Sequence, residues 1–159
     1  MSFPIKPHDI LSLVEDSTAA LVAAPTSVRR AYVCVVMAAH LAEHVAAAKG
    51  YDAAEYRDQV ERTEPALRLV RDLGNYAKHV HITRYSPEAE PLASFDFGNS
   101  HRSLADIMDE TDEEGWREDF STEGFYVRDS SSQVHSLLAV MRAVVYFWRE
   151  ELLRLDLWA

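Results

Sequence analysis

The stretch that decides the fold lies near the end of the chain and reads VHSLLAVMRAVVYFWREELLRL, residues 134–155. Its apolar residues recur every three or four positions over about six turns. They are Val134, Leu137, Leu138, Met141, Val144, Val145, Trp148, Leu152 and Leu155. This spacing is typical of an amphipathic helix that packs against a core. We therefore predict a helix over about 132–156, which follows the turn-forming run at 129–132.

Helical signals also fill the first half of the chain. The pattern predicts three further helices, over about 8–23, 27–49 and 52–79. Thr26 or Ser27 suits the N-cap of the second helix, and Gly50 suits its end. Asp52 suits the N-cap of the third helix. Pro65 lies inside the third helix, where it predicts either a kink or a new helix start.

The middle of the chain, about 80–130, has a different character. Three short β-leaning segments, 81–85, 94–97 and 125–128, are bounded by turn residues. We expect them to form a small sheet of two or three strands inserted before the last helix. The sequence therefore predicts one mainly α domain over residues 1–159, a four-helix bundle with a β insertion and an acidic loop.

Composition limits the class of protein. The chain has 159 residues, of which 48% are hydrophobic and 26% are charged, which is typical of one globular domain. Cys34 is the single cysteine and lies in an apolar run, so we expect a buried thiol and a reducing compartment. The N-terminus lacks a signal-peptide pattern, and no run of about 18 apolar residues is present. We expect a cytoplasmic protein with no membrane partner.

Acidic residues are concentrated in one segment. Lys plus Arg is 16 and Asp plus Glu is 26, so the net charge is −10. Residues 106–123 hold nine acidic residues and one basic residue, Arg117, so this segment carries −8 and the rest of the chain −2. The segment fits a solvated loop. It also fits an acidic tether that covers a basic partner or mimics nucleic acid.

Candidate chemistry is concentrated in the segment RDLGNYAKH, residues 71–79. Arg71, Asn75 and His79 are spaced four apart and form one polar column on a helix. Arginine can bind phosphate oxygens with two hydrogen bonds, and histidine can transfer a proton near neutral pH. Asn75 could position either group. The column also fits an exposed helix face on which Arg71 pairs with Glu64 or another acid.

Three further residues are supporting candidates. Lys78 adjoins His79, although Lys78 and Asp72 also fit a solvated helix face. His40 and His44 lie four apart on the second helix and could face the Arg71 column across the bundle. The same spacing allows the two histidines to bind one metal ion if a third ligand is supplied from elsewhere. We otherwise expect no metal and no cofactor.

Two resemblances rest on these residues. The segment 71–79, followed by VVYFW at 144–148, resembles a group of small bacterial and phage-type helical proteins with an Arg-Asp…Asn-x-x-Lys-His signature. That resemblance implies no particular activity. More distantly, the chain resembles the HEPN superfamily of helical bundles, which includes metal-independent ribonucleases with an Arg and a His in their motif. Here seven residues separate Arg71 from His79, a wider spacing than the four to six residues of that motif.

The HEPN resemblance implies a homodimer that binds or cleaves RNA, in a defence or toxin–antitoxin setting. In that interpretation Arg71 and His79 match the catalytic pair, and Asn75 supports them. Two alternatives stay open. One is a non-enzymatic dimeric module that captures a protein partner through the acidic segment 106–123. The other is a metal-dependent hydrolase that uses His40 and His44.

Overall fold

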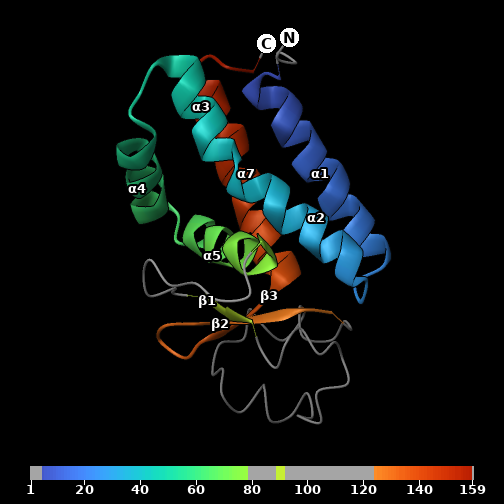
Figure 1. The fold of residues 1–159 in the computed structure, drawn as a ribbon. Coiled ribbons are helices and arrows are strands. Elements are labelled where there is room, and N and C mark those ends of the chain that lie inside the picture. The colour runs from blue at the N-terminus through green and yellow to red at the C-terminus, as the bar shows by residue number, and fades with distance from the viewer. Residues whose placement is uncertain (1–4, 79–88, 92–123, 159) are drawn as a thin grey trace.

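The described part of the chain is mainly helical and carries a small sheet before its last helix, as the sequence predicted (Figure 1). The computed structural model describes residues 5–78, 89–91 and 124–158, and of residues 76–78 and 89–91 it describes the backbone alone. The helices are α1 (Pro7–Ala23), α2 (Val28–Ala39), α3 (Leu41–Lys49), α4 (Ala53–Thr63), α5 (Ala66–Lys78) and α7 (Leu137–Arg154). The strands are β1 (Ala89–Pro91), β2 (Tyr126–Asp129) and β3 (Val134–Ser136).

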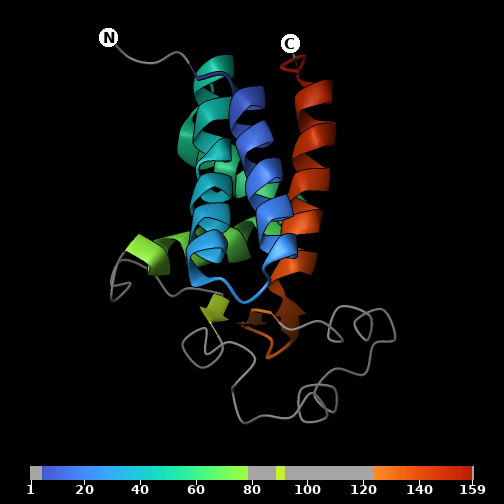
Figure 2. The ribbon, with the colours of Figure 1, turned by 90° about the vertical axis from the view of Figure 1, so that its right-hand side faces the viewer.

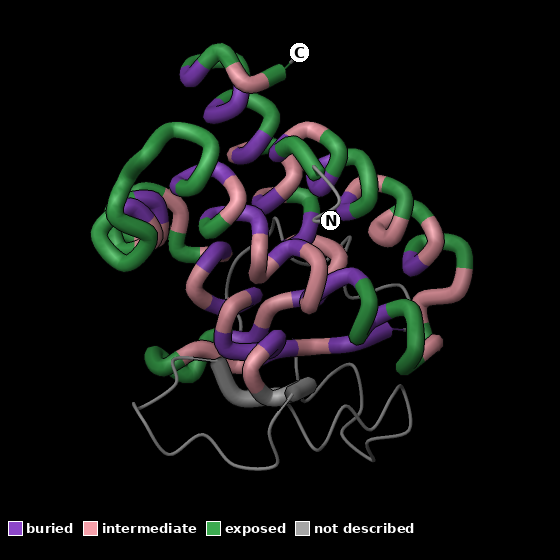
Figure 3. The backbone as a smooth tube through the Cα atoms, turned by 45° about the horizontal axis from the view of Figure 1, so that its top comes forward, coloured by how far each residue is buried: buried purple, intermediate pink, exposed green. Residues whose placement is uncertain are grey.

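Three long helical segments lie side by side, namely α1, the consecutive pair α2 and α3, and α7 (Figure 2). Helix α5 packs against both α2 and α7, and α4 packs against α3. Apolar side chains of these helices meet in one core, in which Trp148, Leu11 and Leu73 are fully buried. Buried and exposed positions alternate along the helices, so each helix has one face toward the core and one face toward solvent (Figure 3).

Local capping confirms three of the predicted helix boundaries. The Ser27 side chain accepts a backbone N–H at the start of α2, at 3.4 Å. Asp52 accepts two backbone N–H groups of the first turn of α4, at 3.0 and 2.9 Å. Gly50 ends α3 with φ of 69°, a left-handed conformation that glycine adopts without steric strain.

The predicted helix over 27–49 is present but is divided at His40 into two consecutive helices, α2 and α3. There the backbone N–H of His40 donates to the carbonyl of Met37, three residues back, at 3.3 Å. This tighter turn breaks the regular hydrogen-bond pattern between α2 and α3.

The predicted helix over 52–79 is two helices, and its interruption lies at Pro65 as expected. Of the two forms that the sequence allowed, the structure has a new helix start rather than a kink. Glu64 supports that start, because its Oε1 accepts the backbone N–H of Ala66 at 3.0 Å. The chain thus turns sharply between α4 and α5, and the two helices meet at an elbow (Figure 1).

The last helix begins at Leu137, so the predicted start near 132 was wrong. Residues 130–136 form a turn and strand β3 instead, because the Asp129 side chain organises a β-hairpin. Its Oδ1 accepts the backbone N–H groups of Ser131 and Gln133, at 2.8 and 3.0 Å. Its Oδ2 lies 2.7 Å from Nε2 of His135. Ser136 then caps α7 by accepting a backbone N–H at 3.4 Å.

The sheet is antiparallel, in the order β1-β2-β3. Val127 pairs with Pro91 on one side and with His135 on the other. Strand β2 confirms the predicted β segment at 125–128. The other two predicted segments, 81–85 and 94–97, lie outside the described residues, as does the acidic segment 106–123.

Taken together, α2 and α3 span Val28–Lys49, 22 residues that are long and apolar enough to cross a membrane by length and composition. This segment contains His40, Glu43 and His44, so it is not an uninterrupted apolar run. Of its most apolar window, 44% is buried inside the protein. A core helix passes the same test, so the segment is weak evidence for a membrane span.

Candidate anion-binding site

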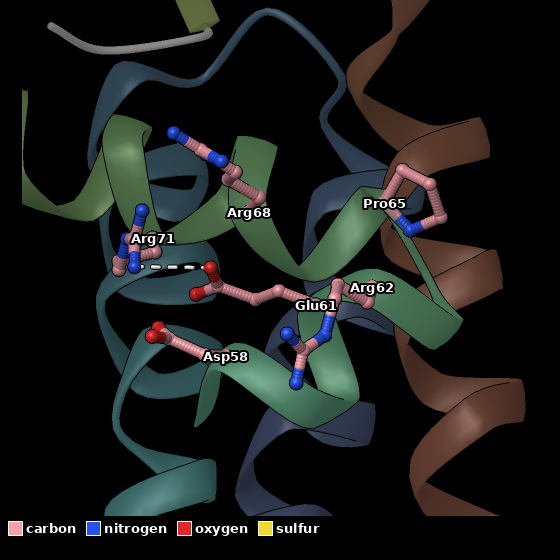
Figure 4. A pocket seen from close by; sticks show the side chains of 6 residues that line it. All are labelled: Asp58, Glu61, Arg62, Pro65, Arg68 and Arg71. Carbon is pink, nitrogen blue, oxygen red and sulfur yellow. Dashed lines mark ion pairs between the residues drawn. The ribbon is translucent and has the colours of Figure 1, made fainter. Parts of the chain in front are cut away.

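A cavity of about 500 Å³ lies at the elbow between α4 and α5 (Figure 4). Its lining is rich in charged side chains, and three of them are arginines. The lining residues are Asp58, Glu61, Arg62, Pro65, Arg68 and Arg71.

The helical spacing explains why these side chains converge. Asp58 lies three residues before Glu61 and four before Arg62, so all three share one face of α4. Arg68 and Arg71 lie three residues apart on α5 and share a face in the same way. The break at Pro65 turns the face of α5 toward that of α4.

One ion pair joins the two helices across the cavity. Nη1 of Arg71 lies 3.0 Å from Oε2 of Glu61, with 18% and 8% of the two side chains exposed. The alternative interpretation expected Arg71 on an exposed face and paired with Glu64 or another acid; Arg71 does pair with an acid, Glu61, but its side chain is largely buried. Asp72, expected on a solvated face, is fully buried instead, with its Oδ1 3.7 Å from Nε of Arg71.

Burial and neighbouring positive charges act in opposite directions on the pKa of the Glu61 carboxyl. Burial raises its pKa above the ordinary value, because a carboxylate loses hydration there. The guanidinium groups of Arg71, Arg57 and Arg68 oppose this effect, and Asp58 adds to it. The net direction is upward. Protonation of Glu61 would therefore begin at a higher pH than for a solvated glutamate and would weaken its hold on Arg71.

The cavity is suited to an anion. With both carboxylates ionised, three arginines and two acids give a local charge of 3 − 2 = +1, on a chain whose net charge is −10. Guanidinium groups match the geometry of phosphate and carboxylate oxygens and form two parallel hydrogen bonds with them. The lining thus combines a small net positive charge with guanidinium donors, of which Arg71 is already paired with Glu61.

Two of the three residues of the predicted catalytic column, Arg71 and Asn75, lie in the described part of the chain. Helix α5 extends through Lys78, so Arg71 and Asn75 lie one turn apart on the same face, as the sequence predicted. Asn75 is half-buried. His79 and the side chain of Lys78 lie outside the described residues.

The predicted histidine pair lies at the junction of α2 and α3. His40 is the junction residue, with 38% of its side chain exposed, and its Nδ1 lies 3.4 Å from Oε2 of Glu43. His44 follows one turn later on α3 and is half-buried. Within the described ranges, no group of three or more His, Cys, Asp or Glu side chains is placed to hold a metal ion. The third ligand that the metal alternative requires is therefore not found there.

Sequence reasoning missed most of the cavity lining, including Arg62, Arg68 and Glu61. The available signal was the run of charges in ERTEPALRLVRD, residues 61–72, which flanks a helix-breaking proline. Charge alone could not assign these residues to a shared cavity, because their convergence depends on the angle between the two helices.

Comparison of the chain with protein-family models, with curated proteins and with solved structures found no match. Function is therefore inferred from the residues and geometry of the chain itself.

Proposed function

We propose that the protein binds RNA, with a backbone phosphate held in the cavity at the α4–α5 elbow. The observation that carries this proposal is the presence of three arginines, Arg62, Arg68 and Arg71, in the lining of one cavity. Phosphate contacts from arginine supply much of the affinity in nucleic-acid binding and make it salt-dependent. Arg71, which the sequence singled out for phosphate chemistry, lies in this cavity.

The charge distribution is compatible with a polyanionic ligand at this position. Residues 106–123 carry −8 of the total charge, so the rest of the chain carries only −2. Repulsion of RNA is therefore concentrated in one segment rather than spread over the protein. At long range the net charge of −10 repels RNA, so local contacts supply the binding free energy.

We further propose that the bound RNA is cleaved without a metal ion, as in HEPN-like ribonucleases. The 2′-hydroxyl of one nucleotide attacks the adjacent phosphorus, and the bond to the 5′-oxygen of the next nucleotide breaks. His79 acts as the general acid or base, and Arg71 stabilises the negative charge that develops on the phosphorus oxygens. Asn75 positions one of these groups. A HEPN-like four-helix bundle, a cytoplasmic homodimer and a role in defence belong to this proposal.

Binding is tested by fluorescence anisotropy with a labelled single-stranded RNA at several salt concentrations. Arg68→Ala is one informative variant, and thermal unfolding shows whether the loss of Arg68 disturbs the fold; Arg71 is avoided because it joins α5 to Glu61 of α4. We expect Arg68→Ala to weaken binding about tenfold, the loss of one charge-assisted contact. The slope of log affinity against log salt concentration should fall by about one, because one phosphate contact is lost. Arg29→Ala, which removes an exposed arginine from α2, is the matched control. An equal loss in both variants would contradict the proposed site.

Cleavage is tested separately, with excess chelator, on a mixture of RNAs. His79→Ala should abolish cleavage and leave the thermal unfolding midpoint unchanged, because the substitution removes a proton-transfer group. Full cleavage by that variant would refute the role of His79. If the wild-type protein cleaves none of the RNAs, the ribonuclease part of the proposal fails and RNA binding stands alone.

A further inference from the structure

A second cavity, of about 600 Å³, opens at the same elbow. It lies between the start of α5, the β2–β3 hairpin and the first half of α7. Pro65 lines this cavity as well as the arginine cavity, so the two spaces adjoin at that residue. Its volume falls within the range of about 300–1,000 Å³ that is usual for small-molecule sites.

The two sides of this second cavity differ in chemistry. One wall is apolar and comes from both helices, with Leu69 of α5 and Val140 of α7 among its residues. Ala139 and Ala143 lie on the same wall, and their short side chains leave the space open. The part of the lining that comes from the hairpin is polar and includes Gln133 and His135.

The hairpin holds its polar edge in place. Nε2 of His135 lies 2.7 Å from Oδ2 of Asp129, which orients the imidazole ring at the cavity. The other oxygen of Asp129 also accepts the Ser131 hydroxyl, at 2.6 Å, in addition to backbone N–H groups. Burial raises the pKa of the Asp129 carboxyl, but hydrogen bonds from Ser131, His135 and Gln133 outweigh this effect and lower it overall. Asp129 is thus an ionised carboxylate whose hydrogen-bonding capacity is used within the hairpin.

We propose that the second cavity takes an unstacked nucleobase of the RNA whose phosphate occupies the arginine cavity. This inference rests on the proposed RNA binding and names the part of the RNA that is recognised. A nucleobase has apolar faces and a polar edge, which matches the apolar wall and the polar hairpin edge. Proteins that bind single-stranded RNA commonly pack against the face of a splayed-out base and hydrogen-bond its edge. Here the packing surface is aliphatic. The shared Pro65 makes the two cavities neighbours, as a base and a backbone phosphate of one strand require.

The test compares two ligands of equal length and charge, a single-stranded RNA and an abasic ribose-phosphate oligomer. Ala143→Phe places an aromatic ring in the cavity, and Ala139→Phe does the same from one turn away on α7. Ala48→Phe, at an exposed position of α3, is the matched control. Thermal unfolding of each variant shows whether the protein still folds. If Ala143→Phe does not fold, Ala139→Phe is used in its place.

The wild-type protein should bind the RNA about tenfold more tightly than the abasic oligomer, because one base is removed from water against the aliphatic wall. Ala143→Phe should lower RNA affinity to the abasic level and leave abasic binding unchanged, whereas Arg68→Ala should weaken both. Equal wild-type affinity for the two ligands would overturn the base site and leave the proposed RNA binding intact. An equal loss of both ligands in Ala143→Phe would also overturn it. Failure of both ligands to bind the wild-type protein would refute the proposed function together with the base site.

Discussion

The hydroxyl of Tyr56 donates a buried hydrogen bond to Oε1 of Glu151, at 2.8 Å, and joins α4 to the end of α7 across 95 positions of sequence. Glu151 also accepts two hydrogen bonds from the Arg154 guanidinium, each at 2.7 Å. Nearby, Nζ of Lys49 donates to the carbonyl of Leu155 at 2.8 Å and links the end of α3 to the end of α7. The Tyr56 bond ties α4, and therefore one wall of the arginine cavity, to α7.

Removal of the Tyr56 hydroxyl should destabilise the protein. Tyr56→Phe keeps the ring contact with Trp148, whose centroid lies 6.5 Å away, but deletes a hydrogen bond to a carboxylate. Such bonds contribute about 1.5–3 kcal/mol, so the free energy of unfolding should fall by about that amount. Urea unfolding at pH 7 measures the change. Tyr51→Phe, at an exposed tyrosine, is the control and should be neutral; equal effects in the two variants would contradict this interpretation.

Stability should fall in acid because of Glu151. The Arg154 hydrogen bonds lower the pKa of the Glu151 carboxyl, burial opposes them, and the Tyr56 hydrogen bond adds to the lowering. A carboxyl with a lowered pKa in the folded state stabilises the fold above its unfolded pKa, about 4.3. That contribution is lost as the pH falls through the folded pKa. Asp129, whose pKa is also lowered, acts in the same direction.

This pH dependence can be assigned by urea unfolding of Glu151→Gln at a series of pH values between 7 and about 3. The variant should be less stable than wild type at neutral pH, and the difference should shrink as the pH falls. A constant difference over the whole range would show that Glu151 is not the titrating group.

The crossing of α2 and α5 depends on Gly74. A Cβ at this position would lie 2.9 Å from Cβ of Ala39 and 3.5 Å from the carbonyl oxygen of Val35. Gly74→Ala gains up to about 1 kcal/mol of helix propensity. Overpacking costs about 1–3 kcal/mol, and Cβ of Ala39 can move away only together with its backbone, so we expect net destabilisation.

The double variant Ala39→Gly/Gly74→Ala should recover most of that loss, because it exchanges which helix carries the methyl group. Ala48→Gly, at an exposed position of α3, calibrates the propensity cost of a new glycine. Denaturant unfolding of the single and double variants measures the coupling. Strictly additive effects would show that the two positions do not restrict each other.

Cys34 should be unreactive in the folded protein. Its side chain is fully buried, and burial raises the pKa of the thiol to about 11, although a hydrogen bond with Thr18 opposes the shift. The thiolate is the reactive form, so a disulfide reagent at pH of about 8 should label the native protein only slowly. Labelling should become rapid in denaturant. Stoichiometric labelling of the native protein within seconds would contradict the buried position.

The features that the sequence predicted correctly depend on interactions between residues that are close in sequence. Ser27 and Asp52 cap helices by accepting N–H groups of the very next turn, and Gly50 ends a helix through its own backbone conformation. Pro65 breaks a helix because it lacks a donor. The apolar spacing of 137–155 predicted the buried face of α7, including Trp148 and Leu152. Such signals act within one turn and are readable from the residue order.

The candidate site was decided by tertiary structure. Arg71 was singled out from helical spacing, but its partner Glu61 lies on a different helix, and their contact depends on how α5 turns at the elbow. The sequence suggested a turn at Asp129 and the start of a helix near His135. In the structure, pairing with β2 makes residues 134–136 a strand. Asp72 is buried although its neighbours in sequence suggested a solvated face. Residue order sets short-range backbone preferences, whereas ion pairs and cavities depend on which distant segments the common core brings together.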